Sequence, residues 1–420
     1  MTCRRAWIAT LIFLAVVINY MDRIALSVAA KSIVAEFGFT PVQMGYLFSA
    51  FLWTYVVCLI PLGLLVDRVG TKPMIGTGIA LWSAATALTA AVGSLATLLT
   101  ARLVMGASEA TTFPAGGRVI RDWFPARERG FVTTLFNGGS TAGPALGAIA
   151  TAALVTQFGW RIAFIALGAL GFIWLAAWLI WYRRPEEAPW LGASERDMIL
   201  AERDGAPIAG REAVASSVWY LFAQPGVWGL ILTQACLVYT AYLFLTWLPT
   251  YLQSSRDLST MNTGYLTAIP YLCTILLGLA IARFSDRVLS ATDIQTGRRR
   301  NHIAAMAILS LLILAAPAVD NIWLLLSVLT LVLTGSTTGA GLNFTLASDL
   351  QRNPKDVARV IAMTAFGGNL FGLIAPIITG YIVSATGGYT WAFRVAALLL
   401  VCGALATLTL TRNPIRPQHA

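Results

Sequence analysis

The stretch NYMDR at residues 19–23 decides how the sequence is interpreted, because it places a carboxylate, Asp22, beside a guanidinium, Arg23, at the far end of an apolar run. The run from Ala6 to Leu26 is long enough to span a bilayer core roughly 30 Å thick. A charge at the middle of such a span costs about 2.5 to 3.5 kcal/mol, so charged residues there usually have a function. The alternative is a solvated ion pair at the membrane surface. Because the apolar pattern resumes directly after Arg23, we expect the pair to be buried in protein.

The composition extends this interpretation to the whole chain. Of 420 residues, 57% are hydrophobic and only 11% are charged, which lies outside the range of soluble globular domains. Apolar runs of about 20 residues recur from end to end, so we predict an all-α polytopic membrane protein. The seventh run is too long for one straight span, and its first residues are expected to form a surface helix. About twelve spans are predicted, at Ala6–Val28, Val42–Val66, Met74–Val92, Leu95–Gly117, Gly130–Val155, Trp160–Tyr182, Trp219–Tyr251, Thr263–Phe284, Ile303–Val319, Ile322–Ser348, Val357–Val383 and Thr390–Leu410.

The net charge of +10 reports membrane topology. Basic residues fall at the termini and in every second loop, whereas the intervening loops hold only Lys31, Arg161, Arg256 and Arg394. This is the positive-inside pattern, and it predicts that both termini are cytoplasmic. The basic residues then face anionic lipid, and we expect no nucleic-acid partner.

The N-terminal run also has a second interpretation, as a signal peptide cleaved near Ala29. Cleavage there would remove Asp22 and Arg23 and leave an odd number of spans. We therefore favour a retained first span.

Residues that could support enzymatic chemistry are missing from the apolar spans. The only histidines, His302 and His419, lie at predicted cytoplasmic edges, and the five cysteines are scattered without close pairs. The sequence also lacks the GxSxG and HExxH motifs. We expect no enzyme activity, no metal site and no cofactor.

A repeated motif indicates two halves. Asp67 and Arg68 follow Gly63 at the end of the second span, and Asp286 with Arg287 stands at the end of the eighth. We expect these four charged residues to dock on neighbouring helix ends and to control gating. The predicted division is an N-terminal six-helix bundle at residues 1–182, a cytoplasmic linker with a short surface helix at 183–217, and a C-terminal six-helix bundle at 218–420.

These motifs resemble the major facilitator superfamily, and a narrower set resembles its anion:cation symporter family. The narrower set comprises the NYMDR stretch, Glu109-Ala110-Thr111-Thr112-Phe113-Pro114, Trp123-Phe124-Pro125 with Glu128-Arg129-Gly130, and Phe366-Gly367-Gly368-Asn369 ahead of Pro376. The resemblance implies two pseudo-symmetric six-helix halves that rock around a midplane site. It also implies a monomer in the bacterial inner membrane that carries sugar acids such as galactonate, hexuronates or glucarate together with protons.

The fourth span adds two charged residues, Arg102 and Glu109, about two turns apart on one helix face. Small neighbours let Glu109 face the bundle interior. Arg102 is either a structural partner of Asp22 or Glu109, or a member of the proton-coupling site.

The resemblance assigns roles to the remaining candidates. It implies that Arg23 anchors the substrate, that Asp22 and Glu109 carry protons, and that Tyr20, Tyr55 and Asn369 contact the sugar acid. Ser140 stands where a longer polar side chain is expected, and it completes the predicted substrate-binding set.

The residues suggest a coupling mechanism. Arg23 offers a permanently charged planar fork that matches a carboxylate. When an anionic substrate occupies Arg23, a neighbouring carboxylate loses its counter-charge and binds a proton. The predicted function is therefore proton-coupled uptake of an organic anion, with a sugar acid as substrate. Aromatic or dicarboxylic acids are the main alternative, and export, suggested by Gly143-Pro144 in the fifth span, is the weaker one.

Overall fold

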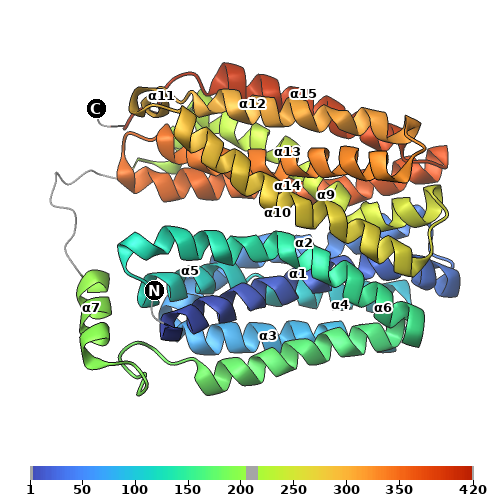
Figure 1. The fold of residues 1–420 in the computed structure, drawn as a ribbon, viewed down its shortest axis with the longest axis horizontal. Helices are drawn as coiled ribbons and strands as arrows, with labels where there is room; N and C mark the ends of the chain where they lie inside the picture. Colours follow the sequence, from blue (N-terminus) through green and yellow to red (C-terminus); the bar gives the residue numbers. More distant parts are fainter. Residues whose placement is uncertain (1–2, 205–215, 419–420) are drawn as a thin grey trace. The chain divides into compact units, whose positions relative to one another are not determined.

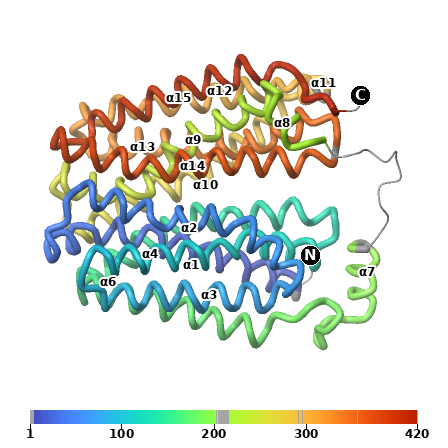
Figure 2. The backbone as a smooth tube through the Cα atoms, turned by 180° about the vertical axis from the view of Figure 1, so that it is seen from behind, coloured from blue at the N-terminus to red at the C-terminus, as the bar shows by residue number. Residues whose placement is uncertain are grey.

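The computed structural model describes residues 3–204 and 216–418, and within these ranges the chain is helical with no β-strand. It divides into two compact units (Figures 1 and 2). Unit 1 comprises Met1–Phe39, Ala50–Gly210 and Leu258–Tyr265, and unit 2 comprises Thr40–Ser49, Arg211–Asp257 and Leu266–Ala420.

The helices follow the predicted apolar runs closely. The first part of the chain forms α1 (Cys3–Phe37), α2 (Pro41–Val69), α3 (Thr71–Leu88), the 3-10 helix η1 (Thr89–Ala91), α4 (Leu95–Glu109), α5 (Thr112–Trp123), α6 (Ala126–Trp181) and α7 (Ala193–Asp204). The second part forms α8 (Val218–Phe222), α9 (Pro225–Ser255), α10 (Thr260–Val288), α11 (Ala291–Gln295), α12 (Arg299–Leu309), the 3-10 helix η2 (Ser310–Ala318), α13 (Ile322–Asp349), α14 (Pro354–Thr386) and α15 (Thr390–Leu410). The seventh run begins with the separate short helix α8, as predicted.

The number of long apolar helices fits the prediction of about twelve spans. Ten helices in the described ranges are long and apolar enough to cross a membrane. One of them, α6, contains a non-helical residue, Gly159, with φ 83° and ψ 163°, so it consists of two helices joined at a kink. The fourth apolar run supplies α4 and α5. The chain is a multi-pass membrane protein.

The fourth span is not the single helix that we predicted. The helix stops after Glu109 and restarts at Thr112, with a turn at Ala110 and Thr111. Pro114 explains the break, because proline has no backbone N–H to donate to the Ala110 carbonyl and its ring clashes with that carbonyl in a continuous helix. Glu109 therefore lies at a helix end.

Glycines bring α1 and α6 into close contact. A Cβ atom on Gly143 would lie 2.6 Å from the Val17 carbonyl oxygen, and one on Gly147 would lie 2.7 Å from the Cα atom of Met21. Small residues let membrane helices approach in this way. The packing holds the part of α1 that carries Tyr20, Asp22 and Arg23 against α6.

We expect Gly143→Ala to lower the melting temperature of the detergent-solubilised protein, because overpacking costs about 1–3 kcal/mol. Gly138→Ala on the same helix is the control, since a Cβ atom there meets nothing within 4 Å. It should be neutral or slightly stabilising. Equal melting temperatures for the two variants would contradict the packing argument.

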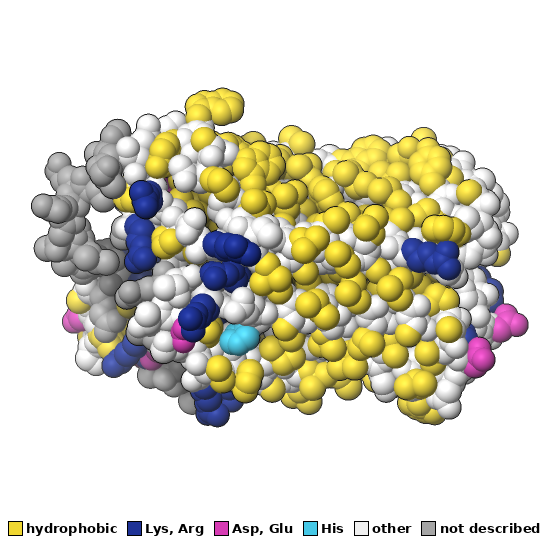
Figure 3. Space-filling model, turned by 90° about the horizontal axis from the view of Figure 1, so that it is seen from above, with side chains coloured by type: hydrophobic (Ala, Val, Ile, Leu, Met, Phe, Trp, Pro, Cys, Tyr) yellow, Lys and Arg dark blue, Asp and Glu magenta, His cyan; other side chains and the backbone are white. Residues whose placement is uncertain are grey.

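Large apolar side chains are exposed on the helices. Leu276 is 73% exposed, and Trp323 and Leu398 are each 64% exposed. Figure 3 shows one face of the molecule on which hydrophobic side chains cover the middle and Lys and Arg gather mainly toward one end. A continuous apolar surface of this kind suits contact with lipid.

The linker contains the predicted surface helix, α7, and the structure adds that it is docked on unit 1. Ile199 of α7 is 2% exposed and belongs to the hydrophobic core, and Trp190 stacks on Trp123 with ring centroids 5.2 Å apart. The buried side chain of Arg5 bonds Glu195 at 2.7 Å. The linker therefore packs as part of unit 1 up to α7, while its residues 205–215 lie outside the described ranges.

Candidate functional site

A buried ion pair joins α1 to the end of α4. Nε of Arg23 donates to Oε2 of Glu109 at 2.8 Å, and the two side chains are 1% and 0% exposed. Asp22 is also buried, at 1% exposed, so the alternative of a solvated pair at the membrane surface is wrong. The partner of Arg23 in this pair is Glu109, 86 residues away. A buried ion pair is stable only when its geometry is good enough to offset the cost of desolvating both charges. Removing one member leaves the other as an uncompensated buried charge.

Three aromatic rings surround the guanidinium of Arg23. Its Cζ atom lies 4.5 Å from the ring centroid of Tyr20, 4.8 Å from that of Phe51 and 5.0 Å from that of Tyr55. Cation–π contacts are strengthened when the cation is buried, as Arg23 is. The structure thus brings the predicted residues Tyr20 and Tyr55 to Arg23.

The Phe51 ring lies close to two guanidiniums, those of Arg23 and Arg102. The Cζ atom of Arg102 lies 5.2 Å from the Phe51 ring, and one of its Nη atoms donates to the Met105 sulfur at 3.3 Å. No carboxylate in the described ranges lies within ion-pair distance of Arg102, although Asp22 and Glu109 act on it electrostatically. Arg102 is thus a buried cation close to two carboxylates and bonded to neither.

Asp22 completes this group of charges. The charges that act on it are those of Glu109 and Arg102, and the hydroxyl of Thr86 lies beside it. Neither carboxylate oxygen accepts a hydrogen bond of normal geometry from the described residues. Asn19, one turn earlier on α1, is fully buried, and its amide lies beside Glu109. Unit 1 therefore holds two carboxylates and two guanidiniums in one buried cluster.

Two further predicted residues, Ser140 and Asn369, lie on α6 and α14. Ser140 is half-buried on α6, and its hydroxyl donates to the Asn137 carbonyl at 2.7 Å. Asn369 lies on α14 in unit 2, where it is half-buried and adjoins Gly368, which packs close to the side chain of Gln234.

Unit 2 contains a neutral polar pair, Asn343 and Gln234, of which Gln234 was not predicted. Nδ2 of Asn343 donates at 2.9 Å both to Oε1 of Gln234 and to the Leu230 carbonyl, and Gln234 and Asn343 are both buried. An amide inside an apolar span, as Gln234 is, was the available signal.

Two of the four charged residues of the repeated motif form ion pairs with neighbouring helices. Asp67 accepts a bond from Arg118 of α5 at 2.6 Å, and Asp286 accepts one from Arg299 of α12 at 2.7 Å. Arg68 and Arg287, the other predicted members, are exposed.

The site also contains a residue that we did not predict, Phe51. It is apolar within an apolar span, so composition gives no sign of a function. The available signal was its position four residues before Tyr55, which puts the two rings on the same face of α2.

The described residues contain no group of three or more His, Cys, Asp or Glu side chains that could hold a metal ion. His302 contacts Ser285 at 2.8 Å, and His419 lies outside the described ranges.

Comparisons with known proteins identify the family and similar transporters. The model of the Major Facilitator Superfamily matches residues 12–354. The chain is 32% identical to a probable galactarate/D-glucarate transporter of Bacillus subtilis (strain 168), over 99% of this chain and 93% of that one. It is 32% identical to a probable L-galactonate transporter of Escherichia coli (strain K12), over 96% and 89%. It is 30% identical to a D-galactonate transporter of Escherichia coli O6:H1, over 97% and 95%.

A solved structure shares the fold. It is a bacterial homologue of the human lysosomal transporter Spinster in an inward-facing, unoccupied conformation, with a TM-score of 0.78 at 18% identity over 99% of this chain and all of the other. The family and these relatives are transporters and not enzymes. Fold, family model and relatives agree, and the chain belongs to the major facilitator superfamily.

Proposed function

We propose that the protein is a proton-coupled carrier that takes up an organic anion of the sugar-acid class, an aldonate or a hexuronate, by alternating access. The observation that carries the proposal is the buried pair of Arg23 and Glu109 within an aromatic cage. The sugar-acid relatives, which align along nearly the whole chain, support the substrate class.

The first step is an exchange of partners at Arg23. A substrate carboxylate matches the guanidinium fork and competes with Glu109 for it. The rings of Tyr20 and Tyr55 keep the guanidinium in place and offer hydroxyl groups to a polyhydroxylated substrate. Asn369 and Ser140 are proposed as further contacts to the substrate.

The second step is proton binding. Glu109, once displaced from Arg23, is a buried carboxylate without its counter-charge, and the neutral form is then favoured. Asp22 is the second proposed proton site, and Arg102 balances the two carboxylates. Because binding is reciprocal, protonation raises substrate affinity by the same factor as substrate raises proton affinity. That reciprocity is the basis of symport.

The proposed setting is the bacterial inner membrane, with a monomeric chain and both termini in the cytoplasm, as the positive-inside distribution of charge suggests. Residues 1–182 and 218–420 are the proposed moving halves, joined by 183–217. Asp67 and Asp286, through their pairs with Arg118 and Arg299, are the proposed gating contacts, with Arg68 and Arg287 beside them.

A dicarboxylic sugar acid is the second candidate substrate. The specific observation in its favour is Arg102, a second buried guanidinium with no carboxylate in ion-pair distance among the described residues. Galactarate and glucarate, named for one of the relatives, have two carboxylates.

Uptake into proteoliposomes tests the proposal. Vesicles with a higher internal pH are offered radiolabelled galactonate, glucuronate, galactarate and an aromatic acid in parallel. Accumulation of one of the sugar acids that disappears when a protonophore collapses the gradient supports the proposal. Accumulation that ignores the pH gradient but follows sodium would contradict proton coupling.

A further inference from the structure

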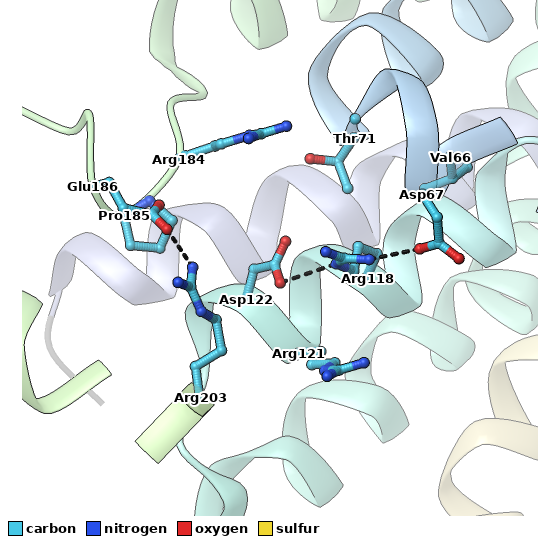
Figure 4. Close-up of a pocket in the computed structure, with 11 residues that line it drawn as sticks. Val66, Asp67, Thr71, Arg118, Arg121, Asp122, Arg184, Pro185, Glu186 and Arg203 are labelled. Carbon is cyan, nitrogen blue, oxygen red and sulfur yellow. Dashed lines mark hydrogen bonds and ion pairs between the residues drawn. The ribbon is translucent and has the colours of Figure 1, made fainter. Parts of the chain in front are cut away.

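Unit 1 contains a cavity of about 300 Å³ (Figure 4), and none of the four charged residues of the buried cluster lines it. It is lined by the end of α2, the start of α3, α5 and the linker around α7, and its residues are Val66, Asp67, Gly70, Thr71, Arg118, Arg121, Asp122, Arg184, Pro185, Glu186 and Arg203. Its volume falls at the lower end of the range for small-ligand pockets. The distribution of basic residues in these loops puts the cavity at the cytoplasmic surface.

The carboxylates around the cavity already have partners. Arg118 bonds Asp67 at 2.6 Å and Asp122 at 3.1 Å, and Arg203 bonds Glu186 (Figure 4). Two of the four arginines thus satisfy all three acidic side chains.

The other two arginines, Arg121 and Arg184, are left over. Both are exposed, and neither guanidinium makes a hydrogen bond or an ion pair with any residue in the described part of the chain. They come from different elements, α5 and the linker, so the chain places them at one cavity by tertiary structure.

A third positive feature faces the same cavity, the N-terminus of α3. Gly70 is the N-cap of this 18-residue helix, and no side chain caps it. The first backbone N–H groups of a helix carry a partial positive charge and bind anions. In α3 these are the N–H groups of Thr71 and Lys72, because Pro73 has none. A Cβ atom on Gly70 would lie 2.5 Å from Nη2 of Arg184, so the guanidinium rests directly on the helix start.

This contact is unfavourable by itself, because it sets a full positive charge against the positive end of a helix dipole. An anion in the cavity that contacts both the guanidinium and the helix start would offset this repulsion with two attractions. Phosphate has several acceptor oxygens, fits the arginine fork and is the usual ligand of helix N-termini.

We propose that this cavity binds a phosphate group through Arg184, Arg121 and the N-terminus of α3, and that bound phosphate fastens the linker to unit 1. The group comes either from the headgroup of an anionic lipid or from free phosphate, and the chemistry of recognition is the same.

The test uses the full-length protein and two probes. In detergent, binding of inorganic phosphate is titrated at constant ionic strength against chloride. In nanodiscs, retention of phosphatidylglycerol is compared with that of phosphatidylcholine by native mass spectrometry. Arg184→Gln and Arg121→Gln are each expected to weaken binding about tenfold, the value of one charge-assisted contact.

Arg127→Gln is the matched control, since Arg127 is exposed at the start of α6 and does not line the cavity. Selective loss of phosphatidylglycerol in the two variants identifies a lipid headgroup, and selective loss of phosphate binding identifies the free ion. Because Arg121 is exposed and its guanidinium bonds no residue in the described part of the chain, Arg121→Gln still tests the proposal if Arg184→Gln is unstable. The proposal fails if both probes bind the variants as tightly as the wild type, or if Arg127→Gln loses as much.

Discussion

Glu109→Gln is expected to abolish accumulation of substrate against its concentration gradient while leaving exchange across the membrane intact. Gln preserves the shape of the side chain but cannot take up the proton that the proposed cycle needs. For one proton carried with a monoanion, each pH unit supports about tenfold accumulation. In proteoliposomes with a higher internal pH, preloaded with unlabelled substrate at the external concentration, the variant should therefore exchange label only until the inside-to-outside ratio is about one.

The matched control is Glu36→Gln, which removes a carboxylate from the same unit. Glu36 is 38% exposed and pairs with Arg161 at 2.5 Å at the end of α1. This variant should accumulate substrate like the wild type. Gradient-driven accumulation by Glu109→Gln would move the proton site elsewhere, with Asp22 as the next candidate.

Arg23→Lys is expected to weaken substrate binding by roughly 10- to 100-fold, although the charge is retained. Lysine has no planar fork, so it cannot bind a carboxylate through two parallel bonds or stack on aromatic rings such as those of Tyr20 and Tyr55 as arginine does. The measurement is the dissociation constant for the transported acid, with the melting temperature recorded for each variant.

Arg161→Lys makes the same chemical change at a surface site. Arg161 lies 4.3 Å from the Trp160 ring centroid and pairs with Glu36, but its side chain is 41% exposed. Surface pairs contribute about 0–1 kcal/mol, so this variant should bind substrate normally. Equal affinity of Arg23→Lys and wild type would show that Arg23 is only a structural partner of Glu109.

The sequence was sufficient to predict that Asp22 and Arg23 are buried, because apolar residues continue on both sides of them. It was not sufficient to predict that Arg23 bonds Glu109. Partner choice depends on how α1 and α4 are rotated about their axes, and that rotation is set by contacts such as Gly106 against the Phe51 carbonyl.

The sequence also contained a signal for the break between α4 and α5, but the apolar composition around it hid that signal. The break after Glu109 follows from Pro114, but the apolar run continues through it, so hydropathy alone joins α4 to α5. The role of Phe51 could not be predicted in this way. In the sequence, a phenylalanine in an apolar span looks the same whether it faces lipid or, as in the fold, the guanidiniums of Arg23 and Arg102.

The docking of the linker constrains how the gene can be divided. Trp190 and Ile199 are packed into unit 1, and at the other end of the linker Ser216 is buried and bonds Asp356 of unit 2 at 2.6 Å. If the protein is coexpressed as two polypeptides, the first fragment must therefore retain α7 and the second must begin no later than Ser216. A boundary placed at the end of α6 would expose, on the first fragment, the core surface that the linker covers. The second fragment would then carry α7 as an extension with nothing to pack against.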